Sequence, residues 1–201
     1  MRRVLIFVAA AAVSACSDST GTRVVQRNES DLSFLRTAAD APPLASFGAS
    51  FWAVRGEDRE LRLSYRPPAG STDSTDFLRL RIRDGSLLNL PSGLPIALGD
   101  SVLITVTVID PARMIVELQP AGLVFARGEP AELEMRYKEA DSDYDDDGDV
   151  DGEDDVIEGR LSIWRQERIG EPWVQIGSDV RVDTDEVRAD LTGFTRYAIA
   201  Y

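Results

Sequence analysis

The carboxylates of this 201-residue chain are concentrated in one short segment. Residues 139–158, which we call the acidic insertion, contain twelve Asp and Glu residues and no Lys or Arg. The whole chain has 35 acidic and 22 basic residues, so the rest of it holds 23 acids and 22 bases. Twelve of the 13 net negative charges therefore lie in the acidic insertion. Oxygen ligands gathered in this way suit hard divalent cations.

The spacing of the acids within the insertion matches a calcium-binding loop of the EF-hand type over residues 143–154. Gly148 stands where such loops make their sharp turn, and the apolar Val150 stands two positions later. The sequence therefore predicts calcium as a cofactor, with six residues as ligands. These are the carboxylates of Asp143, Asp145, Asp147, Asp151 and Asp154 and the backbone carbonyl of Asp149.

Two features depart from a paired EF-hand. Asp154 stands where a longer Glu usually supplies both carboxylate oxygens. Residues 131–137 alternate apolar and polar side chains, as a strand does, and Gly159 breaks a helix on the exit side. We therefore expect strand, loop, strand, which resembles the calcium loops of dockerin-like modules. The alternative is a solvated acidic hairpin tip that repels itself and binds no metal.

The chain begins with a segment typical of exported proteins. Arg2 and Arg3 precede an apolar run over residues 4–13 that is too short to cross a bilayer. The run ends in Val13-Ser14-Ala15-Cys16, which resembles the lipobox of bacterial lipoproteins. That resemblance implies a signal peptide over residues 1–15, a lipid on Cys16, and an outer-membrane lipoprotein of the cell envelope that faces the periplasm or the cell surface. The alternative is an ordinary signal peptide with a chance cysteine.

Residues 16–47 are polar and interrupted by prolines, and we expect the lipidated Cys16 followed by a flexible tether. A docked segment around Leu32, Phe34 and Leu35 is the alternative. From residue 48 onward, short runs with period-two alternation predict an all-β fold, an antiparallel β-sandwich over residues 48–201. We expect residues 101–109 to form a central strand covered on both faces, and residues 55–58 to turn a hairpin.

Several function classes are excluded or disfavoured by composition. The chain has no His, which excludes a Ser-His-Asp triad and histidine-ligated zinc. A net charge of -13 disfavours nucleic acid as a partner. The arginine stripe Arg79, Arg81 and Arg83 suits either an anion or pairing with acidic neighbours. Trp164 and Trp173 suit either a sugar platform or packing, and packing is the favoured interpretation.

A family resemblance covers residues 77–201. Four pieces of sequence follow one another in a characteristic order. They are Leu90-Pro91-Ser92-Gly93, the strand over residues 101–109, the segment over residues 118–125 and the closing run over residues 194–200. In that order they resemble the β-sandwich domain shared by ankyrins, netrin receptors and tight-junction scaffold proteins. The resemblance implies a docking or structural module without catalytic residues. Together with the lipid on Cys16 that the lipobox implies, we expect the module to be bound to the membrane and to an unidentified protein or envelope partner. A calcium sensor or adhesion domain is the second interpretation, and a carbohydrate-active enzyme is the third.

Overall fold

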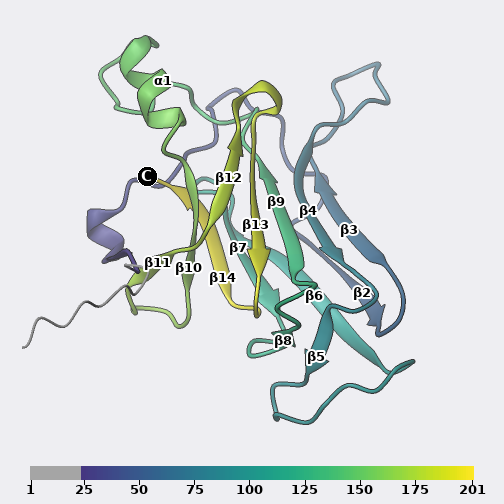
Figure 1. Cartoon of the computed structure of the whole chain (residues 1–201). Helices are drawn as coiled ribbons and strands as arrows, with labels where there is room; N and C mark the ends of the chain where they lie inside the picture. Colours follow the sequence, from purple (N-terminus) through teal and green to yellow (C-terminus); the bar gives the residue numbers. More distant parts are fainter. Residues whose placement is uncertain (1–23) are drawn as a thin grey trace, which may run out of the picture.

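The computed structural model describes residues 24–201 and shows two antiparallel sheets stacked as a β-sandwich (Figure 1). The expected all-β sandwich is confirmed. The signal peptide and Cys16 lie outside the described residues. No helix within residues 24–201 is long and apolar enough to cross a membrane.

The strands form two main sheets and one small one, and all of their pairings are antiparallel. The seven-stranded sheet has the order β1 (Gln26–Arg27), β11 (Trp173–Gln175), β10 (Ser162–Gln166), β14 (Arg196–Ala200), β7 (Ile115–Gln119), β6 (Ser101–Asp110), β2 (Gly48–Val54). The five-stranded sheet has the order β12 (Ser178–Arg181), β13 (Glu186–Leu191), β9 (Ala131–Arg136), β4 (Asp76–Ile82), β3 (Arg59–Ser64). The small sheet pairs β5 (Leu87–Asn89) with β8 (Val124–Phe125), and the helical elements are η1 (Glu29–Asp31), α1 (Gly152–Glu158) and η2 (Val182–Thr184).

The core fills the space between the two main sheets with side chains that recur at every second position. In β6 the side chains from Val102 to Val108 at even positions are buried, as the alternation predicts. The opposite face of β6 is open, because Leu103 is 46% exposed and Ile109 is 39% exposed. The expectation that this strand is covered on both faces is therefore wrong. The covering layer described next reaches β7, β10, β11 and β14 but leaves β6 bare.

The N-terminal segment from residue 24 to residue 47 forms that covering layer. Leu35 is 1% exposed, and its backbone N–H donates to the carbonyl of Ile199 in β14 at 3.0 Å. Leu35 thereby packs into the core between the sheets, whereas Leu32 is buried on the outer face of the seven-stranded sheet, and Phe34 bridges to Ala200. The expected flexible tether is therefore wrong for residues 24–47. The small Ala198 and Ala200 leave room on the sheet that the larger apolar side chains fill.

The two tryptophans belong to this outer layer. Trp164 and Trp173 are each at most 2% exposed, and Phe34 meets Trp173 edge to face with ring centroids 5.2 Å apart. The Trp164 indole N–H donates to the carbonyl of Ala200 at 3.1 Å. Packing is therefore confirmed, and the rings are not available as a sugar platform.

The turn over residues 55–58 also differs from expectation. β2 pairs with β6 in the seven-stranded sheet, whereas β3 pairs with β4 in the five-stranded sheet. The turn therefore carries the chain from one sheet to the other and makes no hairpin. Gly56 permits this crossing with a φ of +101°, a value that side chains with a Cβ rarely adopt.

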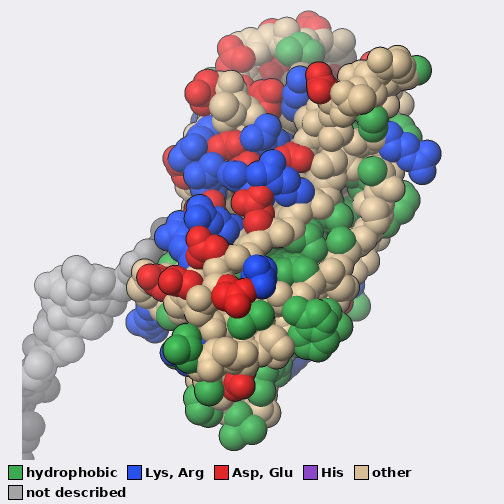
Figure 2. Space-filling view, turned by 90° about the vertical axis from the view of Figure 1, so that its right-hand side faces the viewer, with side chains coloured by type: hydrophobic (Ala, Val, Ile, Leu, Met, Phe, Trp, Pro, Cys, Tyr) green, Lys and Arg blue, Asp and Glu red, His purple; other side chains and the backbone are tan. Residues whose placement is uncertain are grey.

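The outer face of the five-stranded sheet carries the arginine stripe, and each stripe residue has an acidic partner. Arg79 contacts Glu134, Arg81 contacts Asp58 at 3.3 Å, and Arg83 contacts Glu132 at 3.4 Å. Figure 2 shows the basic and acidic side chains interleaved on this part of the surface. The favoured interpretation, pairing with acidic neighbours, is confirmed.

Candidate metal site in the acidic insertion

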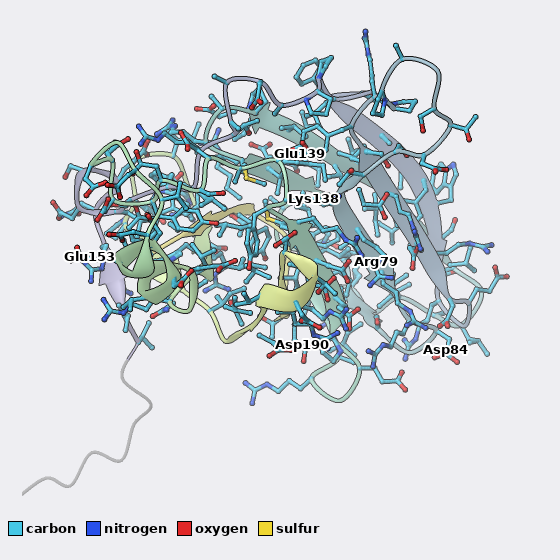
Figure 3. The ribbon with its side chains drawn as sticks, turned by 90° about the horizontal axis from the view of Figure 1, so that it is seen from above. Arg79, Asp84, Lys138, Glu139, Glu153 and Asp190 are labelled. Atoms are coloured by element: carbon cyan, nitrogen blue, oxygen red, sulfur yellow. The ribbon has the colours of Figure 1, made fainter. Side chains whose placement is uncertain are left out.

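The acidic insertion joins β9 to β10 and projects beyond one end of the sandwich (Figure 1). Lys138 and Glu139 lie near the end of β9, whereas Glu153 lies on α1 at the far side of the insertion (Figure 3). Tyr137 is 3% exposed, and its hydroxyl donates to Glu158 Oε1 at 2.9 Å. This contact ties the start of the insertion to its end.

Three of the predicted ligands come together. Asp143, Asp145 and Asp147 each offer a carboxylate oxygen, and these oxygens lie within 4.8 Å of one another. Calcium binds oxygen at about 2.3–2.6 Å, so two oxygens on one ion are at most about 5 Å apart. The three carboxylates are therefore close enough together to hold one metal ion.

Backbone N–H groups of the loop already point at these carboxylates. Asp143 Oδ1 accepts from the N–H of Asp147 at 3.1 Å, and Asp143 Oδ2 accepts from the N–H of Gly148 at 3.0 Å. The N–H of Asp149 donates to Asp147 Oδ1 at 3.1 Å. Gly148 has a φ of +99°, which confirms that the chain turns sharply at the predicted position. The turn thus wraps residue 149 around the cluster.

The other two predicted carboxylates have a different role, because both act at the start of α1. Asp151 is the N-cap of α1 and accepts from the N–H of Glu153 at 2.7 Å. Asp154 accepts from the N–H of Asp151 at 2.9 Å and from the N–H of Tyr144 at 2.6 Å. It is 3% exposed, and it closes the loop by joining its beginning to its end.

The exit side of the loop is therefore helical, and the expected strand, loop, strand becomes strand, loop, helix, strand. Gly159 is the C-cap of α1, which places the helix break one residue after the helix ends. The reciprocal hydrogen bonds of Asp151 and Asp154 form a capping box, which satisfies N–H groups that a helix start leaves unpaired. The expected strand before the loop is confirmed as β9.

The loop is fixed to the sandwich by contacts with the N-terminal segment and with the C-terminal residue Tyr201. The hydroxyl of Tyr201 donates to the carbonyl of Tyr144, and the N–H of Asp141 donates to the carbonyl of Arg36 at 2.8 Å. The guanidinium of Arg36 also pairs with Asp146. A cavity of about 280 Å³ lies between these groups and opens beside Asp143.

The electrostatics of the loop distinguish the cluster from the cap. Partial desolvation and the neighbouring charge of Asp147 raise the pKa of Asp145. The N–H group of Asp151 lowers the pKa of Asp154, with help from the N–H of Tyr144. The cluster is therefore a set of mutually repelling charges that a cation would stabilise, whereas the Asp154 carboxylate is already stabilised by the backbone.

No family model, curated protein or solved structure matches this chain. The resemblance to the ankyrin and netrin-receptor type of domain stays a prediction. The site is therefore interpreted from its own geometry, which shows that Asp143, Asp145 and Asp147 could hold a metal ion.

Two features of the site were not predicted from the sequence. α1 had a signal, because an Asp followed three residues later by another acid is typical of a helix start. Arg36 had none, because it lies 110 residues from Asp146 in the chain and no local pattern connects them.

Proposed function

We propose that this protein is a non-catalytic β-sandwich module of the bacterial cell envelope, anchored through a lipid on Cys16, whose acidic insertion binds Ca²⁺. The observation that carries the calcium proposal is the convergence of Asp143, Asp145 and Asp147 within 4.8 Å on a loop that Gly148 already turns around them. The lipobox-like residues 13–16 support the anchor. The resemblance to a docking domain supports the non-catalytic interaction role, with a protein or another envelope component as partner.

The donor set favours calcium over transition metals. The chain has no His, and its one cysteine is Cys16, so the loop offers oxygen ligands alone. Ca²⁺ accepts oxygen ligands in a flexible coordination geometry, whereas Mg²⁺ demands a stricter octahedral arrangement and retains its waters. Asp143, Asp145 and Asp147 would hold the ion, with the carbonyl of Asp149 beside them. The short Asp154 is committed to backbone N–H groups, which favours weak affinity, about 0.1 to 1 mM.

Calcium in this loop would act on the structure by removing repulsion. The cluster carboxylates repel one another, and the same loop leads into the cap of α1 and contacts Arg36 of the N-terminal segment. A bound cation neutralises the cluster and so stabilises the loop together with its attachments. At ten times Kd, binding contributes about 1.4 kcal/mol to the free energy of unfolding.

The calcium proposal is tested by calorimetry and thermal unfolding. Millimolar CaCl₂ should raise the melting temperature by a few degrees above NaCl of equal ionic strength, and MgCl₂ should raise it less. The double variant Asp143→Asn, Asp147→Asn should lose the calcium shift. The matched control Asp73→Asn, Asp183→Asn removes the same charge from exposed positions outside the loop and should retain the shift. If CaCl₂ and NaCl of matched ionic strength change the melting temperature of the wild-type protein equally, the calcium site is refuted.

The anchor proposal is tested by fractionating cells that express the full chain. The wild-type protein should stay with the membranes after a high-salt wash, because acyl chains on Cys16 supply about 0.8 kcal/mol for each buried CH₂. The Cys16→Ala variant should be released once its signal peptide is cleaved. Retention of cleaved Cys16→Ala protein on the membrane would overturn the proposal.

A further inference from the structure

The edge strand β2 differs from the other long edges of the described sandwich. It ends the seven-stranded sheet and pairs with β6 alone. Its seven residues, Gly48–Val54, carry no charge, whereas the edge strands β3 and β12 each carry Arg and an acidic residue. Proteins usually protect an edge with charges, prolines or very short strands. Within residues 24–201, β2 has none of these protections.

The hydrogen bonds at both ends of β2 show which of its backbone groups face the open side. The carbonyl of Phe47 accepts from Val108 at 2.8 Å, and the N–H of Arg55 donates to Asp100 at 2.9 Å. Pairs that exchange hydrogen bonds alternate along an antiparallel ladder. The odd-numbered residues of β2 therefore bond to β6, and the backbone groups of the even-numbered residues point away from the sheet.

Local hydrogen bonds occupy both groups of Gly48 at one end of this outward row and the carbonyl of Val54 at the other. Gly48 exchanges hydrogen bonds with the side chain of Ser46, and the carbonyl of Val54 accepts from the N–H of Glu57 at 3.1 Å. Between them, the N–H and C=O groups of Ser50 and Trp52 have no hydrogen-bond partner among the described residues. These four groups form a short open template for another strand.

The side chains beside the template are apolar and exposed. Trp52 is 59% exposed, and it lies directly opposite Leu103 of β6, which is 46% exposed. On the other face of β2, Phe51 packs against the core but is only partly buried. Figure 2 looks onto the side of the molecule where β2 and β3 lie in Figure 1, and it shows hydrophobic side chains exposed there. These surroundings favour an incoming strand that carries no charge.

We propose that the occupant is β2 of a second copy of this chain, paired antiparallel about a two-fold axis that passes beside Phe51. In this register Ser50 of one copy lies opposite Trp52 of the other, so the four free groups of each copy exchange four hydrogen bonds across the axis. Trp52 then covers the small side chain of Ser50 of the second copy. Phe51 meets Phe51 of the second copy, an aromatic pair across the strands. The template is thus self-complementary, as a two-fold interface requires.

The charge distribution permits this contact. Twelve of the 13 net negative charges lie in the acidic insertion, which projects from the end of the sandwich opposite to the lower end of β2 (Figure 1). The two acidic insertions therefore stay on the outer parts of the dimer, where salt screens them from each other. Because one strand pair buries little area, the dimer is weak and depends on concentration.

The test measures the mass of the full chain carrying Cys16→Ser in mild detergent by analytical ultracentrifugation over a concentration series. The wild-type β2 should give a monomer–dimer equilibrium, and Trp52→Lys should abolish it with an unchanged melting temperature, because Trp52 is exposed. The matched control Ile169→Lys makes the same kind of change at a residue that is 78% exposed and outside β2, and it should still dimerise. If the copies instead associated through the apolar residues 4–13, the dimer would persist in Trp52→Lys. A monomeric wild type, or a dimer that survives Trp52→Lys, would overturn the proposal.

The register is tested with a single cysteine in the Cys16→Ser background. Phe51→Cys should form a disulfide-linked dimer under mild oxidation, because the two Cα atoms of a non-hydrogen-bonded pair lie about 4.5 Å apart. Leu103→Cys, one strand further from the axis, should stay monomeric. Cross-linking of Leu103→Cys in place of Phe51→Cys would show that a different surface is used.

Discussion

The hydroxyl of Tyr137 donates a hydrogen bond to Glu158 Oε1 at 2.9 Å and so joins the segment after β9 to the last residue of α1. The two residues bracket the acidic insertion and hold its ends together. Burial, the hydrogen bond to Glu158 and the charge of Glu158 raise the pKa of Tyr137. The folded state therefore keeps this phenol protonated at a pH where the unfolded chain ionises it.

Replacing Tyr137 by Phe tests this closure. Loss of the hydrogen bond should lower the free energy of unfolding at neutral pH by about 1 kcal/mol. In the wild type, the stability linked to the raised pKa is fully present below the unfolded value of about 10 and is lost as the pH rises toward the folded value. Urea denaturation at neutral and alkaline pH should therefore show a smaller alkaline loss in Tyr137→Phe. An equal alkaline loss in both proteins would contradict the assignment.

Glu134 should be the most costly acid to neutralise on the five-stranded sheet. It is 1% exposed, and Arg79, Arg136 and Arg188 all contact it. Burial alone would raise its pKa, but the hydrogen bond and charge of Arg79 and the charge of Arg188 outweigh burial and lower it. Its contribution to stability is therefore present above the unfolded carboxyl value of about 4.3 and is lost as the pH falls toward the folded value.

Glu134→Gln should accordingly reduce the free energy of unfolding at neutral pH by about 3 kcal/mol, because it leaves partly buried guanidinium groups without their central carboxylate. Thermal or urea unfolding measures the change. Glu60→Gln is the matched control, since among residues 24–201 the carboxylate of Glu60 pairs with the exposed Arg62 alone, and the change should alter stability by less than about 1 kcal/mol. Equal effects of the two substitutions would refute the special role of Glu134.

Arg36 places a positive charge beside the proposed calcium site through its contact with Asp146. Removal of that charge with Arg36→Ala should strengthen calcium binding about two- to fivefold, because less repulsion opposes the cation at this partly screened position. Isothermal titration calorimetry measures the change. Arg127→Ala removes the same charge from an exposed position after β8 and should leave the affinity unchanged. Weaker calcium binding in Arg36→Ala would mean that Arg36 holds the loop in its binding shape.

The parts of the structure that local patterns control could be predicted from the sequence. Period-two alternation identified β6 and β9, and the ligand spacing identified Asp143, Asp145 and Asp147 as neighbours. The parts that depend on distant contacts could not. Docking of residues 24–47 depends on the room left by alanines in β14, and no periodicity in the segment itself shows this. Asp154 resembled a metal ligand by position alone, whereas its use as a cap depends on a helix of only seven residues.

If Cys16 carries the proposed lipid, the docked N-terminal segment would set how far the sandwich can stand from the membrane. With a lipid on Cys16, eight Cα–Cα steps separate the anchor from Val24, where the described structure begins. At no more than about 3.6 Å for each step, this connecting segment is at most about 30 Å long. A tether that ran to residue 47 would have allowed roughly four times that reach. A lipid on Cys16 would therefore confine the sandwich to a shallow layer above the bilayer, where partners embedded in or lying on the same membrane would be within range.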